Sequence, residues 1–104
     1  MTPRIVLAAE ARIALKDSVS WWRANRPLAP RLLLEEFERA IDLLKELPDV
    51  GTRYDRATFP GVRKIFLRRS SYWLFYLHDR DNSIIYILTV WSAARGSGPP
   101  LRKP

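Results

Sequence analysis

The stretch VRKIFLRRSSYWLFYLHD, residues 62–79, decides the fold of this chain. Cations alternate with large apolar residues over 62–68, and an aromatic-rich run follows over 72–77. Both runs predict β-strands, and RRSS between them predicts a hairpin turn. Because alternate residues of a strand share a face, one face is expected to carry Ile65, Leu67, Tyr72, Leu74 and Tyr76. The opposite face, mixed aromatic and cationic, is expected to carry Lys64, Phe66, Arg68, Trp73, Phe75 and Leu77.

The rest of the chain predicts two helices and two further strands. Apolar residues recur at three- and four-residue steps over 9–24 and 31–47, with the proline-containing turn NRPLAP between them. Short apolar runs at 4–7 and 84–91 predict strands. The predicted fold is therefore α+β, in the order β-α-α-β-β-β. The N-terminal strand and the helical hairpin are expected to pack on one face of a small antiparallel sheet.

Length and composition indicate one domain without a metal or cofactor. The chain has 104 residues, which suits a single core. We expect a toxin-like domain over 1–96 and a basic, mobile tail over 97–104. No cysteine is present and His78 is the one histidine, so neither a metal site nor a cofactor is expected, and His78 is interpreted as a surface residue. No membrane segment or signal peptide is predicted, which favours a cytoplasmic location.

The positive charge lies entirely in the second half of the chain. Residues 1–51 hold eight Lys/Arg and eight Asp/Glu, which cancel. Residues 52–104 hold ten Lys/Arg and three Asp/Glu, which gives this half a net charge of +7. This distribution predicts an anionic partner for the second half, either nucleic acid or an acidic protein segment. The alternative is that scattered surface arginines only keep the protein soluble.

Four segments resemble toxins of the RelE/ParE superfamily, from bacterial type II toxin–antitoxin systems. They are A-x-x-x-L-K-D at 11–17, LPDVG at 47–51, VRKIFLRRSSYWLFY at 62–76 and ILTVWSAAR at 87–95. The segments follow the order and spacing of the family over about residues 4–96. The resemblance implies the same fold that the periodicity predicts.

The superfamily divides by mechanism, since RelE-like members cut messenger RNA on the ribosome and ParE-like members poison DNA gyrase. The RelE-like pattern has two lysines on the first hairpin strand, where this chain has Lys64 and Phe66. Trp73 and Ala93 stand where that pattern has arginines, and 98–104 lacks its late tyrosine. Cleavage by the 2′-hydroxyl needs proton transfer and cations around the phosphate, which these apolar side chains do not supply. The chain therefore resembles the ParE-like branch, with no catalytic residues expected.

This resemblance implies a toxin that inhibits DNA gyrase. A cognate antitoxin would neutralise it by laying a helix and an extended acidic segment over the aromatic–cationic face, and direct nucleic-acid binding would be secondary. Two alternatives stay open. One is a RelE-like, ribosome-dependent mRNA endoribonuclease that uses Lys64, Arg68 and Arg95. The other is a non-toxic antitoxin-binding module, suggested by Ser92 at a position where many relatives carry histidine.

The residues expected to bind the antitoxin or the target are Trp21, Arg63, Lys64, Phe66, Arg68, Arg69, Trp73, Phe75, Trp91 and Arg95. Structural roles are open for several of them. Trp21 could cover the edge of the core, and Arg63 could pair with Asp49 or Asp55. The two arginines of the RRSS turn could form a solvated hairpin tip, and a loop or the tail could cover the aromatic side chains.

Overall fold

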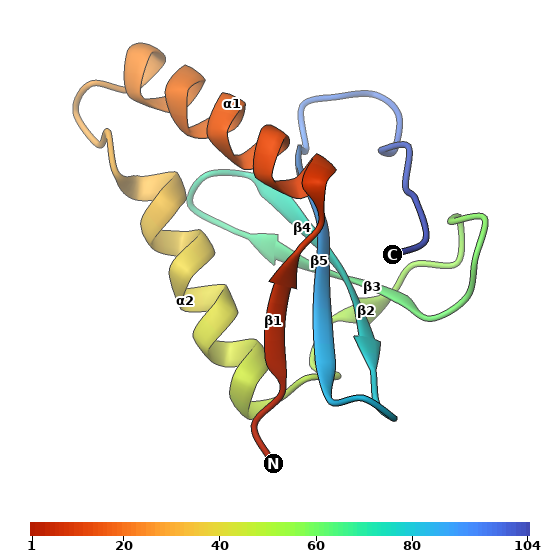
Figure 1. Cartoon of the computed structure of the whole chain (residues 1–104). Helices are drawn as coiled ribbons and strands as arrows, with labels where there is room; N and C mark the ends of the chain where they lie inside the picture. Colours follow the sequence, from red (N-terminus) through yellow and green to blue (C-terminus); the bar gives the residue numbers. More distant parts are fainter.

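The computed structural model describes residues 1–104, which is the whole chain. Its elements are, in order, β1 (Arg4–Leu7), α1 (Ala9–Asn25), α2 (Leu32–Glu46), β2 (Thr52–Arg53), β3 (Val62–Leu67), β4 (Tyr72–Asp79) and β5 (Ile84–Ser92) (Figure 1). The predicted α+β class and the order of the helices and main strands are confirmed. Only the two-residue β2 has no counterpart among the predicted elements.

The strands form a single sheet in the order β1-β5-β4-β3-β2. The four later strands are antiparallel to their neighbours, but β1 runs parallel to β5, with Ile5 opposite Ile85. The sheet is therefore mixed, and the N-terminal strand extends its edge instead of joining the helices on its face. Parallel pairing of β1 is possible because a long stretch of chain separates it from β5.

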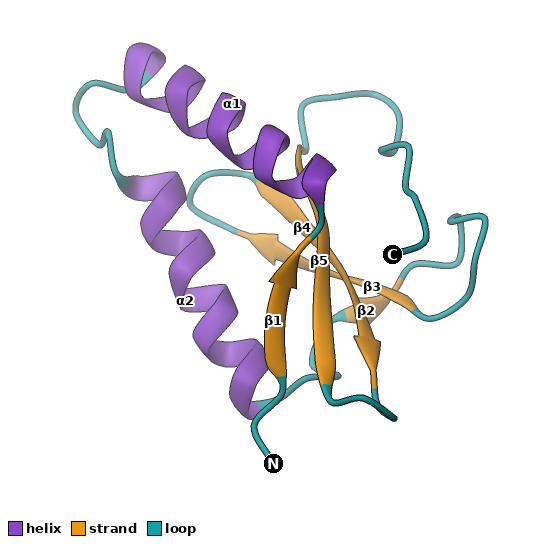
Figure 2. Cartoon of the chain, in the orientation of Figure 1, coloured by secondary structure: helices purple, strands orange, loops and turns teal.

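Both helices pack on one face of the sheet, as predicted (Figure 2). Leu33 and Leu44 of α2 are fully buried against Leu74 and Tyr76 of β4. Trp22 of α1 joins the same core. Burial of each leucine side chain contributes about 1.5–3 kcal/mol. The alternation in residues 62–79 thus assigns the helix-facing side chains correctly.

The opposite side of the sheet, called the outer face below, carries a second and smaller core. Val62, Phe75 and Leu88 are buried there, beneath the loop 54–59 and Leu101 of the C-terminal segment. The outer face is thus only partly open to solvent.

A β-bulge shifts the alternation of side chains along β5. Phe75 of β4 lies opposite Thr89, whereas the next residue, Tyr76, lies opposite Ile87, so Leu88 is the extra residue. Because of this extra residue, Ile87 and Val90 both lie in the main core although they are three positions apart, while Leu88 lies in the outer core.

The C-terminal segment returns over the outer face after β5. The Ser97 carbonyl accepts a hydrogen bond from Trp91 Nε1 at 2.8 Å, and Pro99 is buried. Farther on, Arg102 Nε lies 3.6 Å from a carboxylate oxygen of Glu10 at the start of α1. None of the helices has the length and apolar character needed to span a membrane.

Candidate functional site

The outer face contains a hollow of about 160 Å³ lined by residues of β3, β4 and β5 and of the segments around them. Its aromatic wall consists of Tyr54, Trp73 and Trp91, and its cations include Lys64 and Arg95. No carboxylate and no imidazole lines it. We call it the cation–aromatic hollow, and it brings together five of the predicted site residues: Lys64, Trp73, Phe75, Trp91 and Arg95.

Sheet register builds the aromatic part of this site. Trp73 of β4 lies opposite Phe66 of β3 on one side and opposite Trp91 of β5 on the other. The rings of Phe66 and Trp73 are 4.7 Å apart between centroids. Side chains directly opposite on neighbouring strands contact one another, so these three residues form an aromatic row across the sheet.

Two cations lie directly against the aromatic row. Lys64 Nζ is 4.1 Å from the ring centroid of Trp73, and the Arg95 guanidinium carbon is 4.1 Å from that of Trp91. Both distances fall well within the range of a cation–π interaction. The rings therefore hold the two charges in place while leaving their donors available to an anionic group.

The ten predicted residues differ in exposure. Phe75 is only 2% exposed and belongs to the smaller core of the outer face, whereas Phe66 is 40% exposed and can contact a binding partner. Trp21 on α1 is 48% exposed and shares a second hollow, of about 430 Å³, with Tyr72 and Arg95. Arg95 thus lies between Trp21 and the cation–aromatic hollow.

The hairpin tip presents Arg68 and Arg69 away from the hollow. Both are exposed, and no partner binds their guanidinium groups. The tip itself is fixed, because the Glu36 carboxylate accepts the backbone N–H groups of Arg69 and Ser70 at 2.9 and 2.7 Å. The same carboxylate anchors the hairpin to α2.

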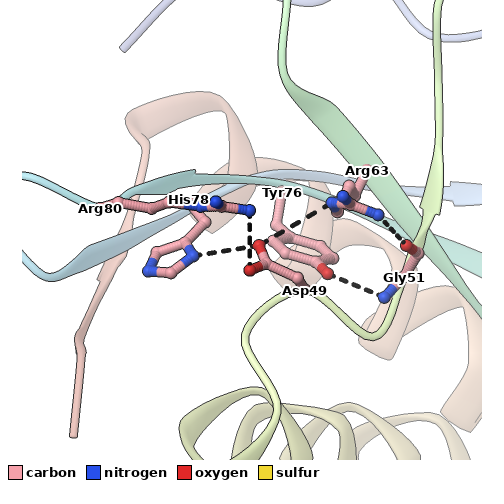
Figure 3. A network of polar contacts seen from close by, with 6 residues as sticks. All are labelled: Asp49, Gly51, Arg63, Tyr76, His78 and Arg80. Carbon is pink, nitrogen blue, oxygen red and sulfur yellow. Dashed lines mark hydrogen bonds and ion pairs between the residues drawn. The ribbon is translucent and has the colours of Figure 1, made fainter. Parts of the chain in front are cut away.

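Arg63 belongs to a separate network of polar contacts beside the end of α2 (Figure 3). Asp49 lies 3.1 Å from His78 Nδ1, 2.9 Å from Arg80 and 3.9 Å from Arg63 Nε. We call this the Asp49 network. Arg63 therefore has the structural pairing with Asp49 that the sequence left open. His78, which the sequence predicts to be a surface residue, hydrogen-bonds to Asp49 and its side chain is only 14% exposed.

The charges around Asp49 determine its protonation. Burial by itself raises the pKa of Asp49, but the hydrogen bond from His78 and the positive charge of Arg80 outweigh it. The pKa of this carboxyl consequently lies below its ordinary value of 3.8. Asp49 thus stays ionised and holds the loop after α2 against β3 and β4.

A buried hydrogen bond completes this attachment. Tyr76 Oη accepts the backbone N–H of Gly51 at 2.9 Å, and Arg63 donates to the Gly51 carbonyl at 2.8 Å. A Cβ at position 51 would lie 2.8 Å from both the Lys64 carbonyl and the Tyr76 ring, so only glycine fits. Burial raises the pKa of Tyr76 above 10.0, which keeps its hydroxyl neutral.

Sequence reasoning missed Tyr54 and Arg56 as lining residues of the cation–aromatic hollow. Both lie in the segment RYDRATF, residues 53–59, for which the sequence predicts only a loop. Its mixture of arginines and aromatic residues resembles the composition of residues 62–76, and this similarity is the sequence feature that could have identified it as part of the site.

Comparison with known proteins identifies the family. The family described as "ParE toxin of type II toxin-antitoxin system, parDE" matches residues 5–96. The chain belongs to the ParE toxin family. The prediction of a RelE/ParE superfamily toxin is therefore confirmed, and this ParE-family chain is a toxin of a type II toxin–antitoxin system. A search of curated proteins finds no significant match.

Solved structures share the fold. The toxin–antitoxin complex RelBE2 from Mycobacterium tuberculosis contains a chain that matches with a TM-score of 0.63 and 26% identity, covering 88% of this chain and 99% of that one. A chain of the chromosomal ParDE system from P. aeruginosa matches with a TM-score of 0.69 and 15% identity, and the match covers 88% of this chain and 96% of that one. The isolated E. coli RelE toxin matches with a TM-score of 0.59 and 22% identity, and the match covers 91% of this chain and 88% of that one. The fold is thus common to ParDE and RelBE toxins.

Proposed function

We propose that this ParE-family toxin acts by binding DNA gyrase and that a cognate antitoxin neutralises it by covering the outer face. Family membership supports this proposal, and similar chains occur in toxin–antitoxin complexes from other bacteria. The toxin would meet gyrase in the cytoplasm. Its site residues would be Trp21, Lys64, Phe66, Arg68, Arg69, Trp73, Trp91 and Arg95.

The composition of the cation–aromatic hollow carries the proposal. It has cations to attract an anionic surface, but no carboxylate or imidazole to accept a proton. Trp73 and Trp91 provide large rigid rings, and Arg95 provides a planar donor group; these residue types dominate the energy of protein–protein contacts. The hollow therefore suits binding of a protein better than cleavage of a phosphodiester.

A supercoiling assay with purified gyrase tests the proposal. The unmodified toxin is expected to inhibit supercoiling or to trap cleaved DNA. A double variant Lys64→Ala/Arg95→Ala should inhibit about tenfold less, which corresponds to about 1.4 kcal/mol of binding free energy. The matched control Arg31→Ala/Lys45→Ala removes the same charge from the exposed surface near the helices and should inhibit normally. Growth arrest in cells without any effect on gyrase would refute the proposal.

Ribonuclease activity is the second candidate, because Tyr54 and Arg56 lie in the hollow beside Lys64. A phenol and two cations could orient a phosphate and transfer a proton. Primer extension on translated messages would then reveal cuts in phase with codons, and Tyr54→Phe would abolish them. Uncut messages during growth arrest would exclude this function, and continued growth without the antitoxin would indicate a non-toxic binding module.

A further inference from the structure

A hollow of about 430 Å³ is lined by residues of α1, of the start of β4 and of the end of β5. Trp21 contributes the largest side chain of its lining, and we call this space the Trp21 hollow. Its volume falls within the range of about 300–1,000 Å³ that is usual for small-molecule sites. Ser92 and Arg95 line both this hollow and the cation–aromatic hollow, so the two spaces adjoin.

Two opposite charges line the Trp21 hollow without pairing. Asp17 of α1 supplies a carboxylate, and Arg95 supplies a guanidinium. No ion pair of the molecule includes either group, and Arg95 instead stacks on the Trp91 ring at 4.1 Å. Both groups are therefore available to a ligand, the carboxylate as an acceptor and the guanidinium as a donor.

The spacing along α1 places the Asp17 carboxylate next to the Trp21 ring. Residues four apart lie on successive turns of the same helix face, about 5–6 Å apart between their Cβ atoms. Trp21 is 48% exposed, and a cation–π contact with Arg26, 5.3 Å from the ring centroid, steadies its ring. A planar group stacked on Trp21 would thus present one edge to Asp17.

A carboxylate beside an aromatic ring selects guanine among the nucleobases. Guanine carries two adjacent donors on one edge, N1–H and the N2 amino group, and the two oxygens of a carboxylate accept both. Adenine and cytosine place an acceptor nitrogen next to their amino group, and uracil has a single N–H between two carbonyls. Stacking on an aromatic side chain strengthens the binding of any base. Trp21 would therefore supply general affinity, and Asp17 would supply specificity.

Arg95 connects this base site to a group of donors for phosphate. The adjoining cation–aromatic hollow adds the cations of Arg56 and Lys64 and contains no carboxylate. Ser97 and Gly98 also line it, and their backbone N–H groups donate to no acceptor within the chain. Cationic side chains and free backbone N–H groups are the usual ligands of phosphate oxygens.

We propose that the Trp21 hollow binds the base of a free guanine nucleotide, whose phosphates lie at Arg95 and in the cation–aromatic hollow. A zwitterionic amino acid would also suit Asp17 and Arg95, but it would leave the cations of Arg56 and Lys64 without a partner. The nucleotide is a ligand in this proposal, and no bond is made or broken. The proposal goes beyond the binding of gyrase and does not depend on it.

Isothermal titration of the full chain with nucleoside diphosphates tests the proposal. GDP should bind at least about tenfold more tightly than ADP, since a bidentate contact to a base edge discriminates by about that factor or more. GDP should also bind at least about tenfold more tightly than guanosine, which lacks the phosphates, and than inorganic pyrophosphate, which lacks the base.

A change of the acceptor at position 17 gives a readout that structural damage would not produce. Asp17→Asn presents one donor and one acceptor, which match xanthine, where a carbonyl replaces the amino group of guanine. This variant should bind xanthosine diphosphate about tenfold more tightly than GDP. Asp42→Asn removes the same charge from the exposed surface of α2, lines neither hollow and should keep the preference for GDP.

A second pair of variants tests the connection between the two hollows. Arg95→Ala should weaken the binding of GDP about tenfold and that of guanosine much less, because guanosine has no phosphate to lose a contact. Arg39→Ala removes an exposed arginine of α2 that lines neither hollow and should bind GDP normally. Thermal unfolding of each variant reports whether it is folded.

Several results would overturn the inference. They are no binding of GDP at about 1 mM, equal binding of GDP and ADP, and no gain of xanthosine diphosphate binding in Asp17→Asn. Equal binding of pyrophosphate and GDP would reveal an anion site without a base site. An RNA oligonucleotide without guanine that binds as tightly as GDP would indicate recognition of the phosphate backbone, and it would overturn the inference as well. All these measurements use the toxin alone, so they do not depend on its cellular target.

Discussion

Replacing Tyr76 by phenylalanine isolates the hydrogen bond that fixes the loop after α2. The Tyr76 side chain is fully buried, and its Oη accepts the Gly51 N–H at 2.9 Å. Phenylalanine keeps the ring and its packing, so the variant loses the acceptor alone. The Gly51 N–H is then buried without a partner, which costs about 1–3 kcal/mol. We expect the free energy of unfolding to fall by that amount.

Urea denaturation measures the effect. For an m-value of about 1.5 kcal/mol/M, the midpoint should fall by roughly 0.7–2 M. The amide of Gly51 should also exchange faster in the variant than in the unmodified chain. Tyr86→Phe is the matched control, because Tyr86 is half-buried on β5 and its hydroxyl, unlike that of Tyr76, makes no hydrogen bond within the protein. It should change stability by less than about 0.5 kcal/mol.

The reasoning would be refuted if Tyr76→Phe changed stability no more than Tyr86→Phe does. That result would mean that the Gly51 N–H finds water or another acceptor at no cost.

The hairpin tip, the Asp49 carboxylate and the Tyr76 phenol allow three more predictions. Glu36→Ala should lower stability by about 1 kcal/mol in thermal unfolding, because the N–H groups of Arg69 and Ser70 lose their acceptor. The pKa of Asp49 is lower in the folded state, so its contribution is present above about pH 3.8 and is lost as the pH falls through the folded value. Asp49→Asn should therefore be less stable by about 0.5–1 kcal/mol at neutral pH and less sensitive to acid. The pKa of Tyr76 is raised, so its stabilising contribution is present below pH 10.0 and is lost above it, and Tyr76→Phe should lack this alkaline loss.

Local patterns of the sequence determined most of the fold. A strand repeats every two residues, so the alternation over 62–79 allows only one assignment of its faces. Likewise, the three- and four-residue spacing in the helices, ended by prolines, predicted both α1 and α2 within two residues of their bounds. The sequence also shows directly that Phe66 and Trp73 stand where the RelE-like pattern has a lysine and an arginine.

Only the tertiary structure decided which outer-face residues are available. Phe75 and Phe66 look alike in the sequence, yet the loop 54–59 buries the first and leaves the second exposed. The parallel pairing of β1 and the contacts of Asp49 likewise depend on segments far apart in the chain. Local periodicity reports which side of a strand is apolar, whereas coverage, pairing partners and free edges depend on long-range packing, which no local pattern encodes.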